Sequence, residues 1–455
     1  MANHTINKKI KTPAKAVPQG QLQDKGVFIM DNKNILKRLS GFDPDLYEIV
    51  SEELTRQHDT LSFIPTAQAA SPFSSYLKGS ALGNELVDHH TVRNHTRLEE
   101  LACQRAAELY GADHAIVRLG SLDTASRVVF FAMAKKGDTI LSFNGRKSEY
   151  CTGDSLSFNF VNYSIDPKLD AIDLDEVEQL TQQHQPKMII YSPVNAPRCT
   201  DFHRLARIAH NAGAVLWVDM GQNAGLVATG TLKSPVPHAD VVTFPAYVLH
   251  GPQNGIILCR SKYAAILDKT VHRTGHDSLK KNVLAALAIT FREAKTEEFH
   301  SYCQQVIANA RALERSLQAE GLRCHGAETE NHLVLPELPS NTDLEDITRT
   351  FADASILVKA ETLQTNQSDV NIPILRLSSI DPTTRSLKEK DMEKLGHIIG
   401  RLLLSPQDNA AIKETRQEIK RIVSGLPIFS EEWLPDSEIT RQSASDSLQM
   451  LMHFN

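Results

Sequence analysis

Two charged side chains lie in apolar surroundings where they could do chemistry. Asp219 follows the run AVLWV, and ligands of open α/β sheets bind at the carboxyl ends of strands. A carboxylate there can fix a positively charged ring nitrogen or a metal ion, although capping the next turn explains it equally well. Arg376 lies within the run ILRLSS. An inward guanidinium can clamp a ligand carboxylate, or it can pair inside the protein, so we expect it to have a partner.

Other patterns with chemical potential are weaker. Histidines gather at 89, 90 and 95, but no cysteine or carboxylate spacing of a metal site accompanies them, so no metal is predicted. The Gly-Pro-Gln-Asn-Gly run at 251–255 has a sufficient explanation in turn formation. The chain has no dinucleotide fingerprint, phosphate loop, zinc-protease motif or nucleophile elbow.

The elements that would position these residues alternate between helix and strand from about 97 to 260. Helical patterns are expected at 98–111, 124–138, 175–184 and 202–213, and short apolar strands at 114–119, 139–143, 187–192, 214–220, 240–245 and 255–259. Such alternation predicts an α/β fold with a mostly parallel sheet and helices on both faces.

We predict five segments along the chain. They are a flexible basic arm (1–27), an N-terminal helical segment (28–96), a large domain (97–285), a smaller C-terminal α+β domain (286–405), and a C-terminal helix with a tail (406–455). The small domain is expected to contain strands at 332–339, 356–361 and 374–379.

Composition excludes several classes of protein. The 455 residues are 41% apolar and 23% charged, which is ordinary globular usage. A net charge of −6 gives no reason to expect nucleic acid or a membrane surface as partner. The six cysteines form no CxxC pair, which favours a reduced, cytoplasmic protein. The longest apolar stretch, near 128–134, is too short to span a bilayer.

Five stretches, in order, resemble serine hydroxymethyltransferases. They are RLEELACQRAAELYGADHAIV, KKGDTILSF, VDMGQNAGLVATG, HADVVTF followed by HGPQNGIIL, and ILRLSSIDPTTRSLKEKDM. The resemblance runs from about 45 to 405. It implies the aspartate-aminotransferase fold (fold type I of the pyridoxal-phosphate enzymes), with a mostly parallel sheet of the seven-stranded type.

The resemblance also implies a specific chemistry. Family members hold pyridoxal phosphate as an imine on a lysine, an aspartate keeps the ring nitrogen protonated, and an arginine binds the substrate carboxylate. A glutamate moves protons, and folate accepts the one-carbon unit. Here Asp219 and Arg376 match the aspartate and the arginine.

The lysine is the main departure from the family. Its position falls on Tyr247, and the stretch 234–261 contains no lysine at all. A slip of register does not help, because Val248 and His250 cannot form an imine either. A replacement amine would have to come from elsewhere, such as Lys147 or Lys359.

Other family positions differ as well. The catalytic glutamate and the tyrosine after it are replaced by Ala67 and Ala69, and a second tyrosine is replaced by Leu86. The Ser-Gly-Ser phosphate cradle becomes Ser121-Leu122-Asp123. Around the ring, the stacking histidine becomes Tyr150, a serine becomes Val194, and the histidine after the aspartate becomes Gln222. A carboxylate at 123 would repel a phosphate.

We therefore interpret the chain as a degenerate homologue that works by binding. It would hold pyridoxal phosphate at most non-covalently, and it would lack the parent activity. The alternative is a repurposed pocket enzyme that uses Tyr150, Tyr247 or His250 for proton transfer, and the third possibility is ordinary hydroxymethyl transfer. Predicted ligand contacts are Asp219, Arg376, Tyr150, Ser121 and Gln222. The family also implies a homodimer in which residues 78–90 and 251–255 reach the neighbouring subunit.

Overall fold

The computed structural model describes residues 32–84, 93–143, 158–166, 171–192, 195–275, 280–326, 328–364 and 371–435. Two compact units divide the chain, Met1–Ser51 and Glu52–Asn455. The predicted domain boundaries remain predictions.

The first unit consists, in its described part, of helix α2 (Asn32–Phe42) and the start of helix α3 (Pro44–Asp59). Asp43 separates the helices, and its carboxylate accepts a hydrogen bond from the backbone N–H of Leu46 at 3.1 Å. Proline at the first position of α3 suits a helix start, because no N–H is needed there. The side chain of Phe42 is 89% exposed.

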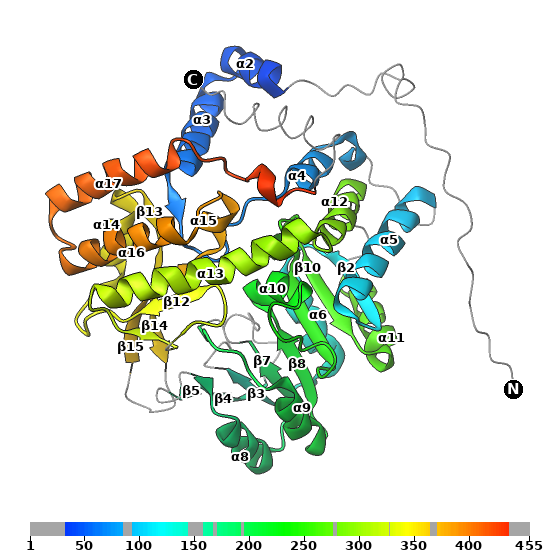
Figure 1. Ribbon diagram of the computed structural model, residues 1–455. Helices are drawn as coiled ribbons and strands as arrows, with labels where there is room; N and C mark the ends of the chain where they lie inside the picture. Colours follow the sequence, from blue (N-terminus) through cyan, green and yellow to red (C-terminus); the bar gives the residue numbers. More distant parts are fainter. Residues whose placement is uncertain are drawn as a thin grey trace, which may run out of the picture. The chain divides into compact units, whose positions relative to one another are not determined.

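A seven-stranded sheet is the centre of the second unit (Figure 1). Its strand order is β2-β10-β9-β8-β7-β3-β4. The strands are β2 (His114–Leu119), β3 (Thr139–Phe143), β4 (Asn159–Tyr163), β7 (Met188–Tyr191), β8 (Val215–Asp219), β9 (Val241–Pro245) and β10 (Gly255–Cys259). Only β10 runs antiparallel to its neighbours in this sheet. The mostly parallel seven-stranded sheet is confirmed.

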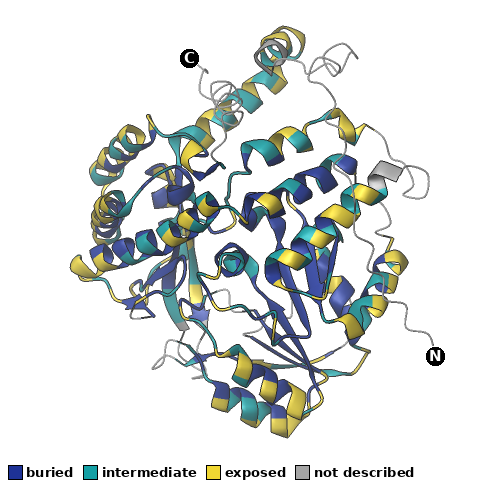
Figure 2. Ribbon diagram, turned by 45° about the vertical axis from the view of Figure 1, so that its right-hand side comes forward, coloured by how far each residue is buried: buried dark blue, intermediate teal, exposed yellow. Residues whose placement is uncertain are grey.

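Helices cover both faces of this sheet, and the strands are buried while the outer helix surfaces are exposed (Figure 2). One face packs on α6 (Leu122–Met133) and α11 (Ser261–Arg273), and it receives Trp217 of β8. The other face receives Val218 and packs on further helices: α5 (Arg93–Tyr110), α8 (Leu174–His184), α9 (Phe202–Asn211), α10 (Ala224–Ala228) and α12 (Lys281–Glu293). Alternating side chains of β8 thus point to opposite faces.

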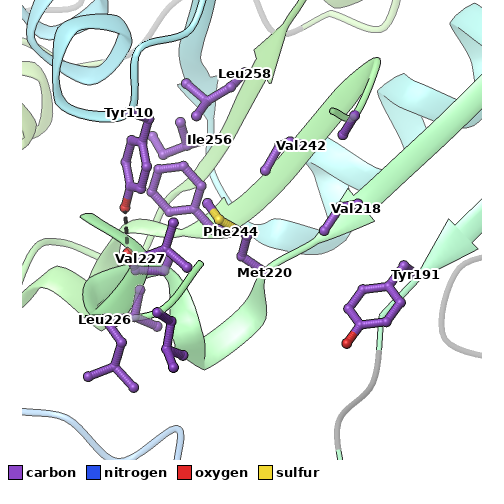
Figure 3. Packing of buried hydrophobic residues seen from close by; sticks show 14 of the residues in the cluster. Tyr110, Tyr191, Val218, Met220, Leu226, Val227, Val242, Phe244, Ile256 and Leu258 are labelled. Carbon is purple, nitrogen blue, oxygen red and sulfur yellow. Dashed lines mark hydrogen bonds between the residues drawn. The ribbon is translucent and has the colours of Figure 1, made fainter. Parts of the chain in front are cut away.

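The α10 side of the sheet is closed by aromatic packing (Figure 3). The hydroxyl of Tyr110 donates a hydrogen bond to the carbonyl of Ala224 at 2.9 Å, and its ring lies 4.9 Å from that of Phe244. These contacts fix α5 and α10 on the strands whose ends carry the candidate site.

A second sheet follows in sequence, in the order β11-β12-β15-β14, with antiparallel neighbours. The strands are β11 (Cys324–His325), β12 (Leu333–Pro336), β14 (Lys359–Gln364) and β15 (Asn371–Ser378), and the helices are α13 (Glu297–Ala319), α14 (Leu344–Asp353), α16 (Glu389–Leu404) and α17 (Asn409–Val423). Ile374 on β15 joins the core of the large sheet, whereas Leu375 joins the core under α13 and α16. One face of the small sheet therefore looks toward the large one.

The remaining elements are short. They are β1 (Leu61–Ser62), α4 (Pro72–Lys78), η1 (Ala81–Gly83), β5 (Ile165–Asp166), β6 (Ala171–Ile172), η2 (Gly221–Asn223), η3 (Ala246–Leu249), β13 (Ile356–Leu357), α15 (Ile380–Thr384) and η4 (Glu431–Trp433). No helix in the described part of the chain is long and apolar enough to cross a membrane.

The sequence prediction was wrong at one helix end. Helix α6 ends at Met133 rather than near Gly137. The segment Lys135–Asp138 turns instead, with the N–H of Asp138 bonded to the carbonyl of Lys135 at 3.0 Å. Gly137 adopts a φ of 88° within this turn, a conformation that glycine reaches without steric cost.

Candidate functional site

The predicted site residues on the large sheet lie at one edge. Asp219 is the last residue of β8, and Tyr247 follows the end of β9 in the short helix η3. The two strands are parallel and place Asp219 level with Thr243. Gln222 lies in η2, directly after β8. Parallel strands thus bring the three side chains to the same carboxyl-terminal edge.

Asp219 is held firmly in place. Its side chain is 5% exposed, and its carboxylate accepts hydrogen bonds from the hydroxyl of Ser192 at 2.9 Å and from the N–H of Gly221 at 3.0 Å. Because it alternates with Val218, it projects to the face that carries Trp217 and α6. The predicted turn-capping role and a ligand-anchoring role are both compatible with these bonds.

The phenol of Tyr247 lies within electrostatic reach of four polar groups. Burial raises its pKa, Asp219 and Asp123 raise it further, and a hydrogen bond with Gln222 together with the charge of Arg376 lowers it in part. A phenol with a raised pKa stays protonated at neutral pH, so this group can donate a hydrogen bond but is a weak acid and is not available as a base.

Arg376 enters the same site from the small sheet. It lies on β15, is 4% exposed, and has the carboxylate of Glu361 at 3.9 Å from its Nε. The expected partner therefore exists, at ion-pair rather than hydrogen-bond distance. Burial, and then the charge of Arg376, lowers the pKa of His332 to about 3, so this imidazole is neutral.

Ser121 caps helix α6 instead of standing free for a ligand. Its hydroxyl oxygen accepts a hydrogen bond from the N–H of Thr124 at 3.1 Å. The backbone of Gly255 packs so closely on it that an added Cβ would lie 2.2 Å from the carbonyl oxygen of Ser121. Asp123 lies in the first turn of α6, where the helix dipole favours a negative charge. The helix start thus already carries an anion of its own.

His250 is a core residue. It is 3% exposed, its Nδ1 lies 2.9 Å from the carbonyl oxygen of Ala69, and its ring lies 4.8 Å from Tyr302 and 5.0 Å from Phe429. Burial lowers its pKa to about 4. A left-handed backbone, with φ at 58°, directs it into this aromatic cluster. These contacts favour packing over proton transfer.

Several predicted positions lie outside the described residues: Tyr150, Lys147, Val194, Leu86 and the histidines at 89 and 90. Lys359, the other candidate for a replacement amine, forms an ion pair with Glu361 at 2.9 Å, and its side chain is 56% exposed. Within the described residues, no group of three histidine, cysteine or acidic side chains is placed to hold a metal ion.

The site can be compared with the needs of pyridoxal phosphate. Asp219 suits a protonated ring nitrogen, and Arg376 suits a carboxylate. Tyr247 offers a phenol where covalent attachment needs an amine, and Asp123 places a negative charge at the helix start where a phosphate would bind. These residues do not fit a covalently held cofactor.

Sequence reasoning missed three partners in the site. Ser192 holds Asp219, Glu361 faces Arg376, and His332 lies close to the same guanidinium. Ser192 is the last residue of the strand predicted at 187–192, which precedes that of Asp219 in the chain, and this strand-end position was a usable signal. No sequence pattern marked Glu361 or His332, because the register between β14 and β15 and the pairing of β12 with β15 bring them to Arg376.

Comparison with known proteins identifies the family. The family model described as serine hydroxymethyltransferase matches residues 39–399. A protein named serine hydroxymethyltransferase from Herminiimonas arsenicoxydans is 33% identical over 413 residues, covering 86% of this chain and 98% of the relative. One of the same name from Myxococcus xanthus (strain DK1622) is 32% identical over 412 residues, covering 87% and 98%. With the mostly parallel seven-stranded sheet, these matches establish the fold type I architecture and show that the chain belongs to the serine hydroxymethyltransferase family.

Proposed function

We propose that this family member lacks the imine chemistry of its relatives and acts as a pseudoenzyme, a binding or regulatory homologue. The position of Tyr247 is the main support for this proposal. It lies after β9, where the resemblance places the lysine, and the stretch 234–261 has no lysine to replace it. A phenol cannot condense with an aldehyde. Asp123 supports the same conclusion, because its charge opposes a phosphate at the start of α6.

A repurposed pocket is the second candidate, and the convergence of polar groups favours it. Asp219, Gln222 and Arg376 all influence the phenol of Tyr247. Such a site could bind an amino-acid-like ligand, or pyridoxal phosphate non-covalently, with Tyr247 as a proton donor. Ordinary hydroxymethyl transfer, which the names of the two relatives suggest, is the competing outcome of the test.

The test is incubation of the purified chain with pyridoxal phosphate, followed by absorbance spectra and borohydride reduction. We expect no coloured, reducible adduct, whereas a relative with the family lysine should form one. One equivalent of reducible adduct on the wild-type chain, mapped by mass spectrometry to a single lysine under conditions that leave the exposed Lys394 unlabelled, would overturn the proposal.

Thermal shifts with pyridoxal phosphate, glycine, serine and folate separate the two candidates. A ligand at 100 times its dissociation constant stabilises the folded state by about 2.7 kcal/mol. Stabilisation by the cofactor without adduct would favour the repurposed pocket. No response to any of the four would favour a protein partner.

Two variants test the roles given to Tyr247 and Asp123. Tyr247→Lys supplies an amine at the proposed position, and Asp123→Ser removes the opposing charge. We expect the double variant to form reducible adduct more readily than Tyr247→Lys alone. Equal adduct formation by both would remove Asp123 from the explanation.

We further propose a cytoplasmic homodimer. Exposed apolar side chains on α4 and η1 support an interface there, since Tyr76 is 55% and Leu82 39% exposed. Light scattering coupled to size exclusion should give the mass of two chains. Tyr76→Glu should shift the mass toward one chain, and an unchanged dimer would place the interface elsewhere.

A further inference from the structure

Three charged side chains share one face of the small sheet. Strands β14 and β15 are antiparallel and place Lys359 directly opposite Arg376. Glu361 lies two residues after Lys359, and therefore on the same face and diagonal to Arg376. This is also the face that carries Ile374 into the core of the large sheet. A lysine, a glutamate and an arginine thus project together toward the site.

The glutamate is shared unequally between the two cations. Its Oε2 lies 2.9 Å from the Nζ of Lys359, whereas its Oε1 lies 3.9 Å from the Nε of Arg376. Exposure differs in the opposite sense, since the side chain of Lys359 is 56% exposed and that of Arg376 only 5%. Because Coulomb attraction grows as water is excluded, Glu361 would be drawn to Arg376 if nothing held it back.

Two further neighbours of Arg376 carry no negative charge. Its charge influences the phenol of Tyr247 and the imidazole of His332. His332 is buried and neutral, and its Nδ1 lies 2.9 Å from the hydroxyl of Ser378. Neither Tyr247 nor His332 adds a negative charge. Among these neighbours, Glu361 is the group that would compete with a ligand carboxylate.

We propose that Lys359 is a positioning residue that holds Glu361 back from Arg376, so that the site admits a small monocarboxylate. The carboxylate of Glu361 then competes with a ligand carboxylate for Arg376, and Lys359 determines how strongly it competes. The inference rests on the binding role proposed above, but it concerns the Lys359–Glu361 pair and not the missing amine. Lys359 is exposed, and it would affect ligand binding at Arg376 through Glu361 and not by contact with the ligand.

The experiment measures acetate binding by calorimetry in the full-length chain, with neutral acetamide as the chemical control. We expect Lys359→Met to weaken acetate binding by about tenfold and Glu361→Gln to strengthen it by a similar factor, as for close charge pairs. The double variant should resemble Glu361→Gln, because without the competitor the lysine has nothing to hold. Acetamide binding should change in none of them.

A matched control separates this effect from a general loss of surface charge. Lys394 is 55% exposed and pairs with Glu418 at 3.5 Å on α16 and α17. Lys394→Met should leave acetate binding unchanged. Thermal melts of every variant exclude unfolding as the cause.

Three results would overturn the inference: no acetate binding by the wild-type chain, equal binding by Lys359→Met, or a loss in the double variant as large as in Lys359→Met. These results are independent of the borohydride test. A reducible cofactor adduct would end the proposed function while leaving the Lys359–Glu361 effect standing, and the reverse also holds.

Discussion

The pH dependence of stability should reveal one buried carboxyl group. Glu293 on α12 is 7% exposed, and its Oε2 accepts a hydrogen bond from the hydroxyl of Ser71 at 2.8 Å. That hydroxyl oxygen in turn accepts a bond from the N–H of Ser74 and so caps α4. Burial raises the pKa of Glu293 from 4.5 to about 7, against the lowering effect of Ser71.

The sign of the effect follows from linkage. A pKa raised in the folded state means that the folded chain holds the proton more tightly, so this stabilisation is complete below pH 4.5 and is lost as the pH rises through about 7. Moving the pKa over this interval corresponds to about 3 kcal/mol. Glu293→Gln keeps an acceptor for Ser71 and removes the titration. Relative to wild type, the variant should therefore gain about 2–3 kcal/mol between about pH 5 and about pH 8.5.

Urea unfolding of both proteins at several pH values measures this difference. Other titrating groups change both proteins alike and cancel. Glu414→Gln, at an exposed position on α17, is the control and should show no such trend. A stability difference between Glu293→Gln and wild type that stays constant with pH would refute the reasoning.

Three further predictions follow from close contacts. Gly255→Ala should destabilise the chain by about 1–3 kcal/mol in urea unfolding, because its Cβ would meet the carbonyl oxygen of Ser121; an unchanged midpoint would contradict this. Arg385→Met should lower the free energy of unfolding by about 3–5 kcal/mol in the same assay, because the fully buried guanidinium donates hydrogen bonds to three backbone carbonyls. A decrease of less than about 1 kcal/mol would be inconsistent with those bonds. Asp219→Asn should lower the pKa of the Tyr247 phenol, because the charge of Asp219 raises that pKa. Ultraviolet titration, with Tyr247→Phe as the reference, measures this pKa, and an unchanged or higher pKa in the variant would contradict the prediction.

Much of the large sheet could be predicted because its strands are apolar on both faces. Strand β8 is buried along its whole length, so its run of apolar residues and the Asp at its end could be read from the chain alone. Strand β4, NFVNY, has partly exposed residues at the sheet edge and no such run. It was missed for this reason, and helix α11 was missed as well, although its sequence SKYAAILDKTVHR has helical spacing.

The site was predictable only where it depends on strand ends. Asp219 and Tyr247 follow adjacent parallel strands, which fixes their common edge. Glu361 and Arg376 meet through an antiparallel register that no local pattern encodes. His250 is only three residues from Tyr247, but its left-handed backbone and aromatic neighbours place it in the core. Tertiary packing therefore decided which nearby polar residues belong to the site.

The polar groups that a cofactor would otherwise satisfy have partners within the chain. Asp219 accepts bonds from Ser192 and Gly221, Arg376 faces Glu361, and the start of α6 carries Asp123. Buried charge without a partner is costly, so a site that depended on a cofactor for its counter-charges would weaken the fold when empty. Here the internal partners remove that dependence. The same partners oppose a ligand of the cofactor's charge, which supports the proposed loss of the parent chemistry.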